Sequence, residues 1–216
     1  MTNTNDLALS IASDDGWAEA AAEAAERTLR GALLKFADRA FTQGTEGAAV
    51  ELGTELVAIA TSAAWVRWQG GKPVETRVRQ PGTRMPDRED LGDQDEKTWE
   101  AGPDGRPKDP WANSRFVYLV NPTTAEAFTF STSSWGGRGA VIDLSDAIAR
   151  MRTVHPDAVP LVALGTAPMK TKFGLKSKPV FKIVGWRSTD GQPIEQPKRL
   201  PAQTRRPALD DDEIPF

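Results

Sequence analysis

The alternation of apolar and polar positions predicts a chain built mainly of β-strands between residues 31 and 187. Residues 50–60 and 64–68 are predicted to form one long bent strand, and Gly53 indicates a bend or bulge within it. Aromatic and β-branched residues on both sides of a turn at 121–124 predict a hairpin. The complete set of predicted strands is 50–60 with 64–68, 73–79, 115–120, 127–132, 160–165, 170–175 and 179–187.

One amphipathic helix is predicted among these strands, at residues 140–152. Four apolar residues recur there at helical spacing: Val141, Leu144, Ile148 and Met151. A long bent strand, a hairpin, a helix and a pair of strands within 161–187 follow one another in the order of an OB-fold, a five-stranded Greek-key barrel. The sequence therefore predicts a mainly β protein with some α, of the OB type. The loops at 72–113 and 173–179 flank the expected binding face.

The segments outside this barrel differ from it in composition. Residues 1–13 are polar and predicted to be disordered, and residues 14–30 are predicted to form an N-terminal helix because they are rich in Ala, Glu and Arg. Residues from about 70 to 113 form a long, proline-rich loop inside the domain. Residues 188–209 are rich in Pro, Gln and Arg and are predicted to be a disordered, flexible linker. An acidic tip, 210–216, ends the chain.

Composition excludes several classes of protein. The chain has no cysteine, which excludes a disulfide framework, a thiolate zinc site and a cysteine nucleophile. Its first residues lack the basic and apolar regions of a signal peptide, and no apolar run is long enough to span a bilayer. We therefore expect a soluble, cytoplasmic protein that does not contact a membrane.

Charge is segregated along the chain. The formal net charge is −3, although proteins that bind nucleic acids are usually basic. Residues 164–206 nevertheless contain ten lysines and arginines and two acids, and residues 85–110 contain nine acids and four bases. The net charge is thus negative because the acids of the tip and of the loop outnumber the bases of one strongly basic region.

The last seven residues join an acidic run to an apolar end: Asp210, Asp211, Asp212, Glu213, Ile214, Pro215 and Phe216. A partner with a basic rim and an apolar pocket could bind the Phe216 ring and the terminal carboxylate together. Such a tip, after a polar linker and a predicted OB-fold, resembles bacterial and phage single-stranded DNA-binding proteins, in particular a divergent phage or prophage type. The resemblance implies a protein of a bacterial or phage-infected cell. It also implies protection of single-stranded DNA with little sequence preference during replication, recombination and repair, and recruitment of the proteins of those processes by the tip.

Basic and aromatic residues interleave in the predicted barrel, and single-strand binding needs both a positive groove for phosphates and flat rings for bases. Lysines gather around the last predicted turn, and a glycine-rich turn at 135–139 precedes the predicted helix. Which rings stack on bases and which belong to the core stays open. The predicted DNA-contacting residues are Trp65, Arg67, Trp68, Lys72, Tyr118, Phe128, Phe130, Trp135, Arg138, Lys170, Lys172, Phe173, Lys176, Lys178, Lys182 and Trp186.

Two other functions stay open at this point. The chain could be an adaptor whose domain binds protein, or a Mg²⁺-dependent nuclease that uses the central carboxylates Asp87, Glu89, Asp90, Asp93, Asp95 and Glu96. These acids lie in a proline-rich loop rather than at strand ends that would fix a metal geometry. We therefore expect no catalysis, no metal and no cofactor, and the sequence indicates no particular oligomeric state.

Overall fold

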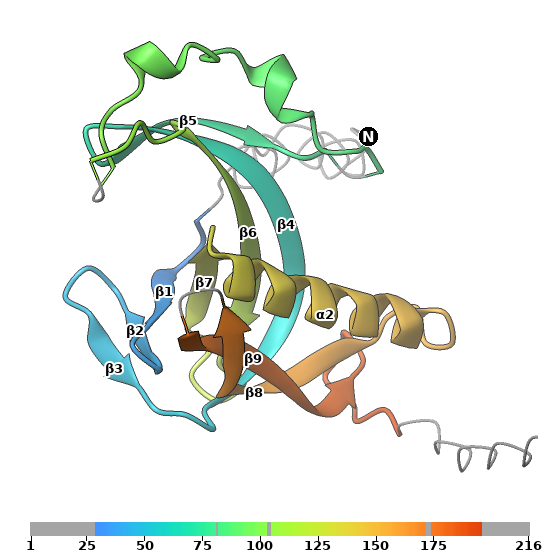
Figure 1. Ribbon diagram of the computed structural model, residues 1–216. Coiled ribbons are helices and arrows are strands. Elements are labelled where there is room, and N and C mark those ends of the chain that lie inside the picture. The colour runs from blue at the N-terminus through green and yellow to red at the C-terminus, as the bar shows by residue number, and fades with distance from the viewer. Residues whose placement is uncertain (1–28, 81, 103–104, 172–173, 196–216) are drawn as a thin grey trace, which may run out of the picture.

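The computed structural model describes residues 29–80, 82–102, 105–171 and 174–195. These residues form a mainly β structure in which nine strands belong to one curled sheet (Figure 1). The strands are β1 (Ala32–Ala37), β2 (Ala40–Gln43), β3 (Ala48–Val50), β4 (Glu55–Gln69), β5 (Lys72–Val78), β6 (Trp111–Val120), β7 (Ala127–Thr132), β8 (Val159–Thr171) and β9 (Gly174–Arg187). The helix α2 (Trp135–Arg152) and two short 3₁₀ helices, η1 (Arg88–Leu91) and η2 (Glu96–Thr98), complete the described elements.

The sheet runs in the order β3-β2-β1-β7-β6-β4-β8-β9, and β5 pairs with β4 beside this path. Its centre is the long antiparallel pair of β4 and β6, which extends from Val57 opposite Val120 to Arg67 opposite Trp111. The β1–β7 pair is parallel and joins the N-terminal strands to the rest of the sheet. In the described part of the chain, no helix combines the length and the apolar character needed to cross a bilayer.

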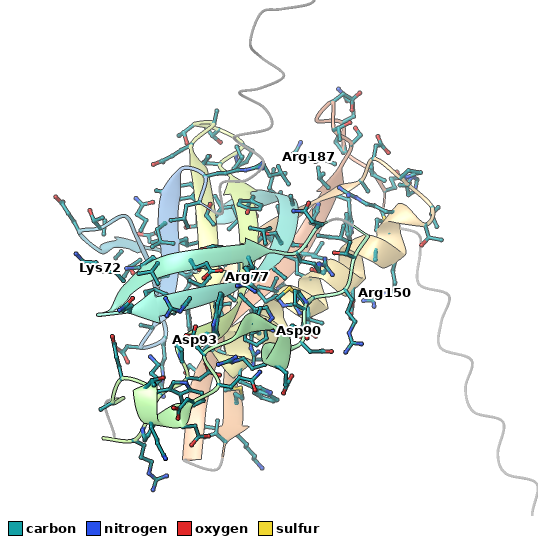
Figure 2. The ribbon with its side chains drawn as sticks, turned by 90° about the horizontal axis from the view of Figure 1, so that it is seen from above. Lys72, Arg77, Asp90, Asp93, Arg150 and Arg187 are labelled. Carbon is teal, nitrogen blue, oxygen red and sulfur yellow. The ribbon has the colours of Figure 1, made fainter. Side chains whose placement is uncertain are left out.

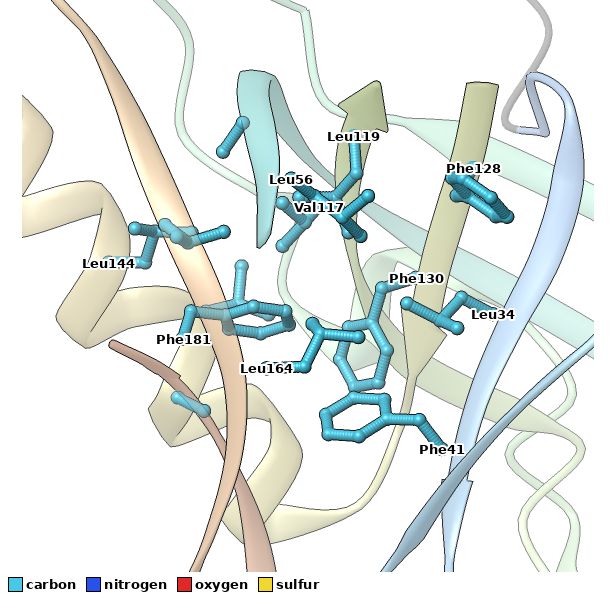
Figure 3. Close-up of a cluster of buried hydrophobic side chains, with 14 residues drawn as sticks. Leu34, Phe41, Leu56, Val117, Leu119, Phe128, Phe130, Leu144, Leu164 and Phe181 are labelled. Atoms are coloured by element: carbon cyan, nitrogen blue, oxygen red, sulfur yellow. The ribbon is translucent and has the colours of Figure 1, made fainter. Parts of the chain in front are cut away.

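The main hydrophobic core fills the inside of the curl, between the sheet and α2 (Figure 3). Phe130 lies at its centre, with ring centroids 5.1 Å from Phe181 and 6.1 Å from Phe41. The helix contributes Val141 and Leu144 to the same cluster. This helix was predicted from its apolar spacing, and the prediction of a mainly β fold with some α is confirmed.

The predicted hairpin is present as β6–β7, and the last two strands pair with each other as β8–β9, but several boundaries differ from the prediction. The final reversal falls between Thr171 and Gly174 rather than at the predicted loop 173–179, because β8 and β9 pair along almost their whole length. The predicted strand 50–68 is divided into β3 and β4, since Gly53 has a φ of 91° and lies in a turn. Residue Ile194 donates its backbone N–H to the Trp186 carbonyl at 2.9 Å, so the predicted linker folds back on β9 at its start.

The β1–β2 hairpin was not predicted. Its turn consists of Asp38 and Arg39, whose φ angles are 49° and 68°. Two consecutive positive φ values are typical of the tight hairpin turn that usually contains Asn-Gly, and this pair of residues does not give that signal. The predicted N-terminal helix falls almost wholly on residues 1–28, and those residues, like 196–216, lie outside the described part of the chain.

Truncation of the ring at the centre of the core should be costly. Phe130 is 1% exposed, and Phe130→Ala should lower the free energy of unfolding by about 3–5 kcal/mol because it leaves a cavity among rings that cannot collapse into it. Leu175→Ala is the control, since Leu175 is 65% exposed and its loss should change stability by less than about 0.5 kcal/mol. Urea unfolding followed by circular dichroism measures both, and equal effects would contradict this description of the core.

Candidate nucleic-acid interface

A cavity of about 680 Å³ opens where the first half of β6, the first turns of α2 and the far end of the β8–β9 hairpin meet. Elements that are distant in sequence therefore contribute to one surface. The residues that line this cavity are Asn113, Arg115, Trp135, Gly136, Arg138, Gly139, Ile142, Asp143, Pro168, Met169, Lys170 and Lys178.

Strand β6 has the apolar core at one end of its inner face and the cavity at the other. Side chains alternate along a strand, so Leu119, Val117, Arg115 and Asn113 share one face. Leu119 and Val117 are buried in the main core, whereas Arg115 and Asn113 line the cavity. The strand continues beyond the core, and its inner face then becomes a polar wall.

The cavity holds positive charge without matching negative charge. The Nε atoms of Arg115 and Arg138 are buried and have no hydrogen-bond partner. Burial lowers the pKa of Arg115, and the positive charges of Arg79 and Arg138 lower it further. The acid among the lining residues, Asp143, is 75% exposed, with its carboxylate 4.0 Å from Lys178 Nζ. An anion bound in the cavity would supply the missing hydrogen-bond acceptors and reduce the repulsion among the arginines.

Trp135 adds an aromatic ring to this basic cavity. It is the first residue of α2, and its side chain is 73% exposed. The Ser134 hydroxyl accepts a hydrogen bond from the Gly137 backbone N–H at 3.1 Å, and this cap fixes the start of the helix. The exposed ring thus lies beside cations that have no hydrogen-bond acceptor at Nε. This is the combination that single-strand binding uses.

The glycine-rich residues 135–139 form the first turns of α2 and not a turn before it, which corrects the predicted helix start at residue 140. The reason is steric. A Cβ on Gly136 would lie 3.0 Å from Met169 and Lys178, and one on Gly137 would overlap the Thr132 hydroxyl. The helix can therefore begin this close to β7 and to the β8–β9 hairpin because these positions have no side chain.

The structure brings four of the predicted DNA-contacting residues together at the cavity: Trp135, Arg138, Lys170 and Lys178. It adds Asn113 and Arg115, which the sequence did not single out, and Arg79 beside them. Lys72, Lys176 and Lys182 are exposed residues that do not line this cavity, as is Trp68, which is 42% exposed. Lys172, Phe173 and the predicted partner-binding tip lie outside the described residues.

Four predicted DNA-contacting rings are buried and offer no face to a base in this structure: Tyr118, Phe128, Phe130 and Trp186. Phe128 and Phe130 belong to the main core, and the Tyr118 hydroxyl is 3.1 Å from Ser62 Oγ. A register shift in the β8–β9 pair leaves one extra residue on β9, which reverses its alternation. Trp186 therefore joins Ile183 in a second buried cluster instead of facing solvent with Val184.

The remaining two predicted residues, Trp65 and Arg67, lie beneath an irregular segment, residues 82–102, which we call the strap. Trp65 donates from Nε1 to the Pro86 carbonyl at 2.9 Å. Arg67 donates from Nε to the Asp93 carboxylate at 2.7 Å. Figure 2 shows the strap residues Asp90 and Asp93 beside the hairpin that carries Lys72 and Arg77. The strap lies within the long, proline-rich loop that the sequence predicts, and these contacts fold it against the sheet.

The central acids do not form a metal site. Among the described residues, no group of three or more His, Asp or Glu side chains is arranged to hold a metal ion. Two of these acids are instead paired with arginines of the strap or the sheet: Asp93 with Arg67 and Asp87 with Arg84.

Comparison with known proteins gives no relative: no family model matches the sequence, and neither the curated proteins nor the solved structures contain a match.

Two glycines of α2 give a matched test of the close approach that shapes the cavity. Gly137→Ala should lower the free energy of unfolding by about 1–3 kcal/mol, because the added methyl group overlaps Thr132. Gly139→Ala should raise it by up to about 1 kcal/mol, since nothing lies within 4 Å and alanine favours a helix. Thermal unfolding of both variants checks the prediction, and a shift of the same sign in both would contradict it.

Proposed function

We propose that this protein binds and protects single-stranded DNA with little base preference, through an OB-type barrel, and that it has no catalytic activity. The observation that carries the proposal is the cavity in which the unpaired Arg115 and Arg138 lie beside the exposed Trp135. Guanidinium groups bind phosphate oxygens, and an indole ring stacks on any base. Neither interaction reads the base sequence, so little base preference is expected.

The strand pairing supports the OB-type barrel. Strands β4, β6, β7, β8 and β9 pair as β4–β6, β6–β7, β4–β8 and β8–β9, and α2 lies between β7 and β8. An OB-fold has a five-stranded Greek-key barrel of this order. In this interpretation β1, β2 and β3 are an N-terminal addition that pairs with β7, at the edge where a closed barrel would have β9.

Recruitment by the tip completes the proposal. The acidic residues 210–213 and the adjoining Ile214-Pro215-Phe216 provide negative charge and an apolar anchor for a pocket with a basic rim on a partner. Pro215 restricts the backbone and so lowers the entropy lost on binding. We propose proteins of DNA replication, recombination and repair as partners, in the cytoplasm of a bacterial or phage-infected cell.

Arginine substitutions at the cavity test the DNA-binding proposal. Arg115→Gln and Arg138→Gln should each weaken binding of a labelled oligo-dT and reduce the slope of log K against log[salt] by about 0.7, the value for one phosphate contact on a single strand. Arg150→Gln is the matched control, because Arg150 is near the other end of α2. Fluorescence anisotropy at several salt concentrations measures this, with circular dichroism to verify folding. Equal slopes in all variants would argue against the site.

The same titration separates the other functions. No binding by the wild-type chain would favour an adaptor whose domain binds protein. Cleavage of the oligonucleotide in the presence of Mg²⁺ would favour a nuclease, provided that the double variant Asp93→Asn, Asp95→Asn does not cleave.

Deletion of residues 210–216 tests the division of labour. DNA affinity should stay the same or rise, because the deletion removes four acidic side chains that compete with phosphates for the basic surface. The truncated chain should lose its partner, which pull-down from a matched cell extract measures against the full chain. Loss of DNA binding on truncation would contradict the assignment of DNA binding to the domain.

A further inference from the structure

The inner face of the sheet continues from the cavity to the surface beneath the strap. Directly opposite residues of an antiparallel pair share a face. Ala63 lies opposite Arg115, Trp65 opposite Asn113 and Arg67 opposite Trp111, so these residues are successive rows of one surface. Arg115 and Asn113 line the open cavity, whereas Trp65, Arg67 and Trp111 contact the strap.

Asp93 is the main polar contact between the strap and this surface. Its carboxylate accepts hydrogen bonds from Arg67 Nε at 2.7 Å, Arg67 Nη2 at 3.3 Å and Trp111 Nε1 at 3.0 Å. The hydrogen bond from Arg67 holds the pKa of Asp93 below its usual range, and the bond from Trp111 also lowers it. The contact is therefore intact at neutral pH. The Arg77 guanidinium lies 4.9 Å from the Trp111 ring centroid and adds positive charge next to it.

The strap is held mainly by polar contacts near the surface. Among residues 82–102, the one buried side chain is Leu91. In the Arg67–Asp93 pair the side chains are 29% and 33% exposed, and contact with solvent weakens the attraction between the two charges. Segments with few buried apolar contacts open at low free-energy cost. The cover can therefore leave the sheet without unfolding the core.

We propose that the strap covers a second DNA-contacting segment formed by Trp65, Arg67 and Trp111, in which the Asp93 carboxylate occupies the position of a backbone phosphate. A phosphate can accept from Arg67 in the same two-pronged manner as a carboxylate. When single-stranded DNA extends beyond the open cavity, a phosphate displaces Asp93, and the two tryptophans become accessible to bases. The inference rests on the proposed function and adds that the DNA strand contacts the sheet beyond the cavity, as far as the surface beneath the strap.

A pair of strap variants isolates this exchange. Asp93→Asn and Glu96→Gln each remove one negative charge, but only Asp93→Asn removes the carboxylate that is paired with Arg67, because the Glu96 side chain has no hydrogen bond or ion pair with any described residue. Asp93→Asn should bind oligo-dT roughly tenfold more tightly, the order expected for one hydrogen bond to a charged group. It should also steepen the slope of log K against log[salt] by about 0.7. Glu96→Gln should leave the slope unchanged.

The outcomes of this experiment are distinct. Equal affinities and slopes for the two variants, with wild-type binding intact, would overturn the second segment and leave the proposed function standing. No binding by wild type at any salt concentration would overturn both.

Limited proteolysis of the wild-type chain gives a second readout that does not depend on the folding of a variant. Trypsin can cut the strap at Arg84, Arg88 and Lys97, and cuts identified by fragment mass report its opening. Saturating oligo-dT should accelerate these cuts at least severalfold, while a cut at Arg39, in the exposed β1–β2 turn, should keep its rate. Unchanged or slower cutting of the strap in the presence of DNA would overturn the proposal.

Discussion

The long antiparallel pairing of β4 with β6 is the constraint on which the rest of the structure depends. Side chains alternate along each strand, so one register decides which residues face inward over the full length of the pair. It places Val117 in the core, Arg115 at the cavity and Trp111 beneath the strap, all on one face. A shift by one residue would turn Arg115 outward and leave Phe116 and Tyr118 to compete for the core. Burial of the apolar side chains at one end of the pair thus fixes the register, and with it the positions of the polar side chains at the other end.

The arginines at the cavity and beneath the strap differ in their hydrogen-bond partners. Arg67 has a carboxylate partner from the strap, whereas the Nε atoms of Arg115 and Arg138 have none within the described residues. Both side chains are partly buried, and a buried N–H without an acceptor is costly, so a bound anion that accepts from these two Nε atoms would stabilise the fold. The contrast between paired and unpaired arginines points to the cavity more clearly than the total charge, which is negative.

Local signals in the sequence predicted the elements but not the surface that they create. The turn at 121–124 and the apolar spacing of α2 were sufficient to predict the β6–β7 hairpin and the helix. The turn at Asp38 and Arg39 was missed because residues with a side chain adopt positive φ there. Simple alternation along β9 placed Trp186 on the solvent face. A β-bulge reverses that alternation, and it depends on pairing with β8, which the sequence of β9 does not reveal. Arg115 was missed because its role depends on Arg79 and Arg138, which come from other parts of the fold.

The strap has both of its ends fixed, since it follows β5 and leads back into β6, and the Arg88–Asp109 ion pair at 2.7 Å closes the loop. The Asp93 carboxylate therefore stays at a high effective concentration near Arg67 even after a ligand has displaced it. An anion bound to Arg67 therefore competes with the Asp93 carboxylate for the same hydrogen bonds. Exchange at this end of the surface should thus be fast, because a returning Asp93 occupies the vacated position before a departing ligand can rebind.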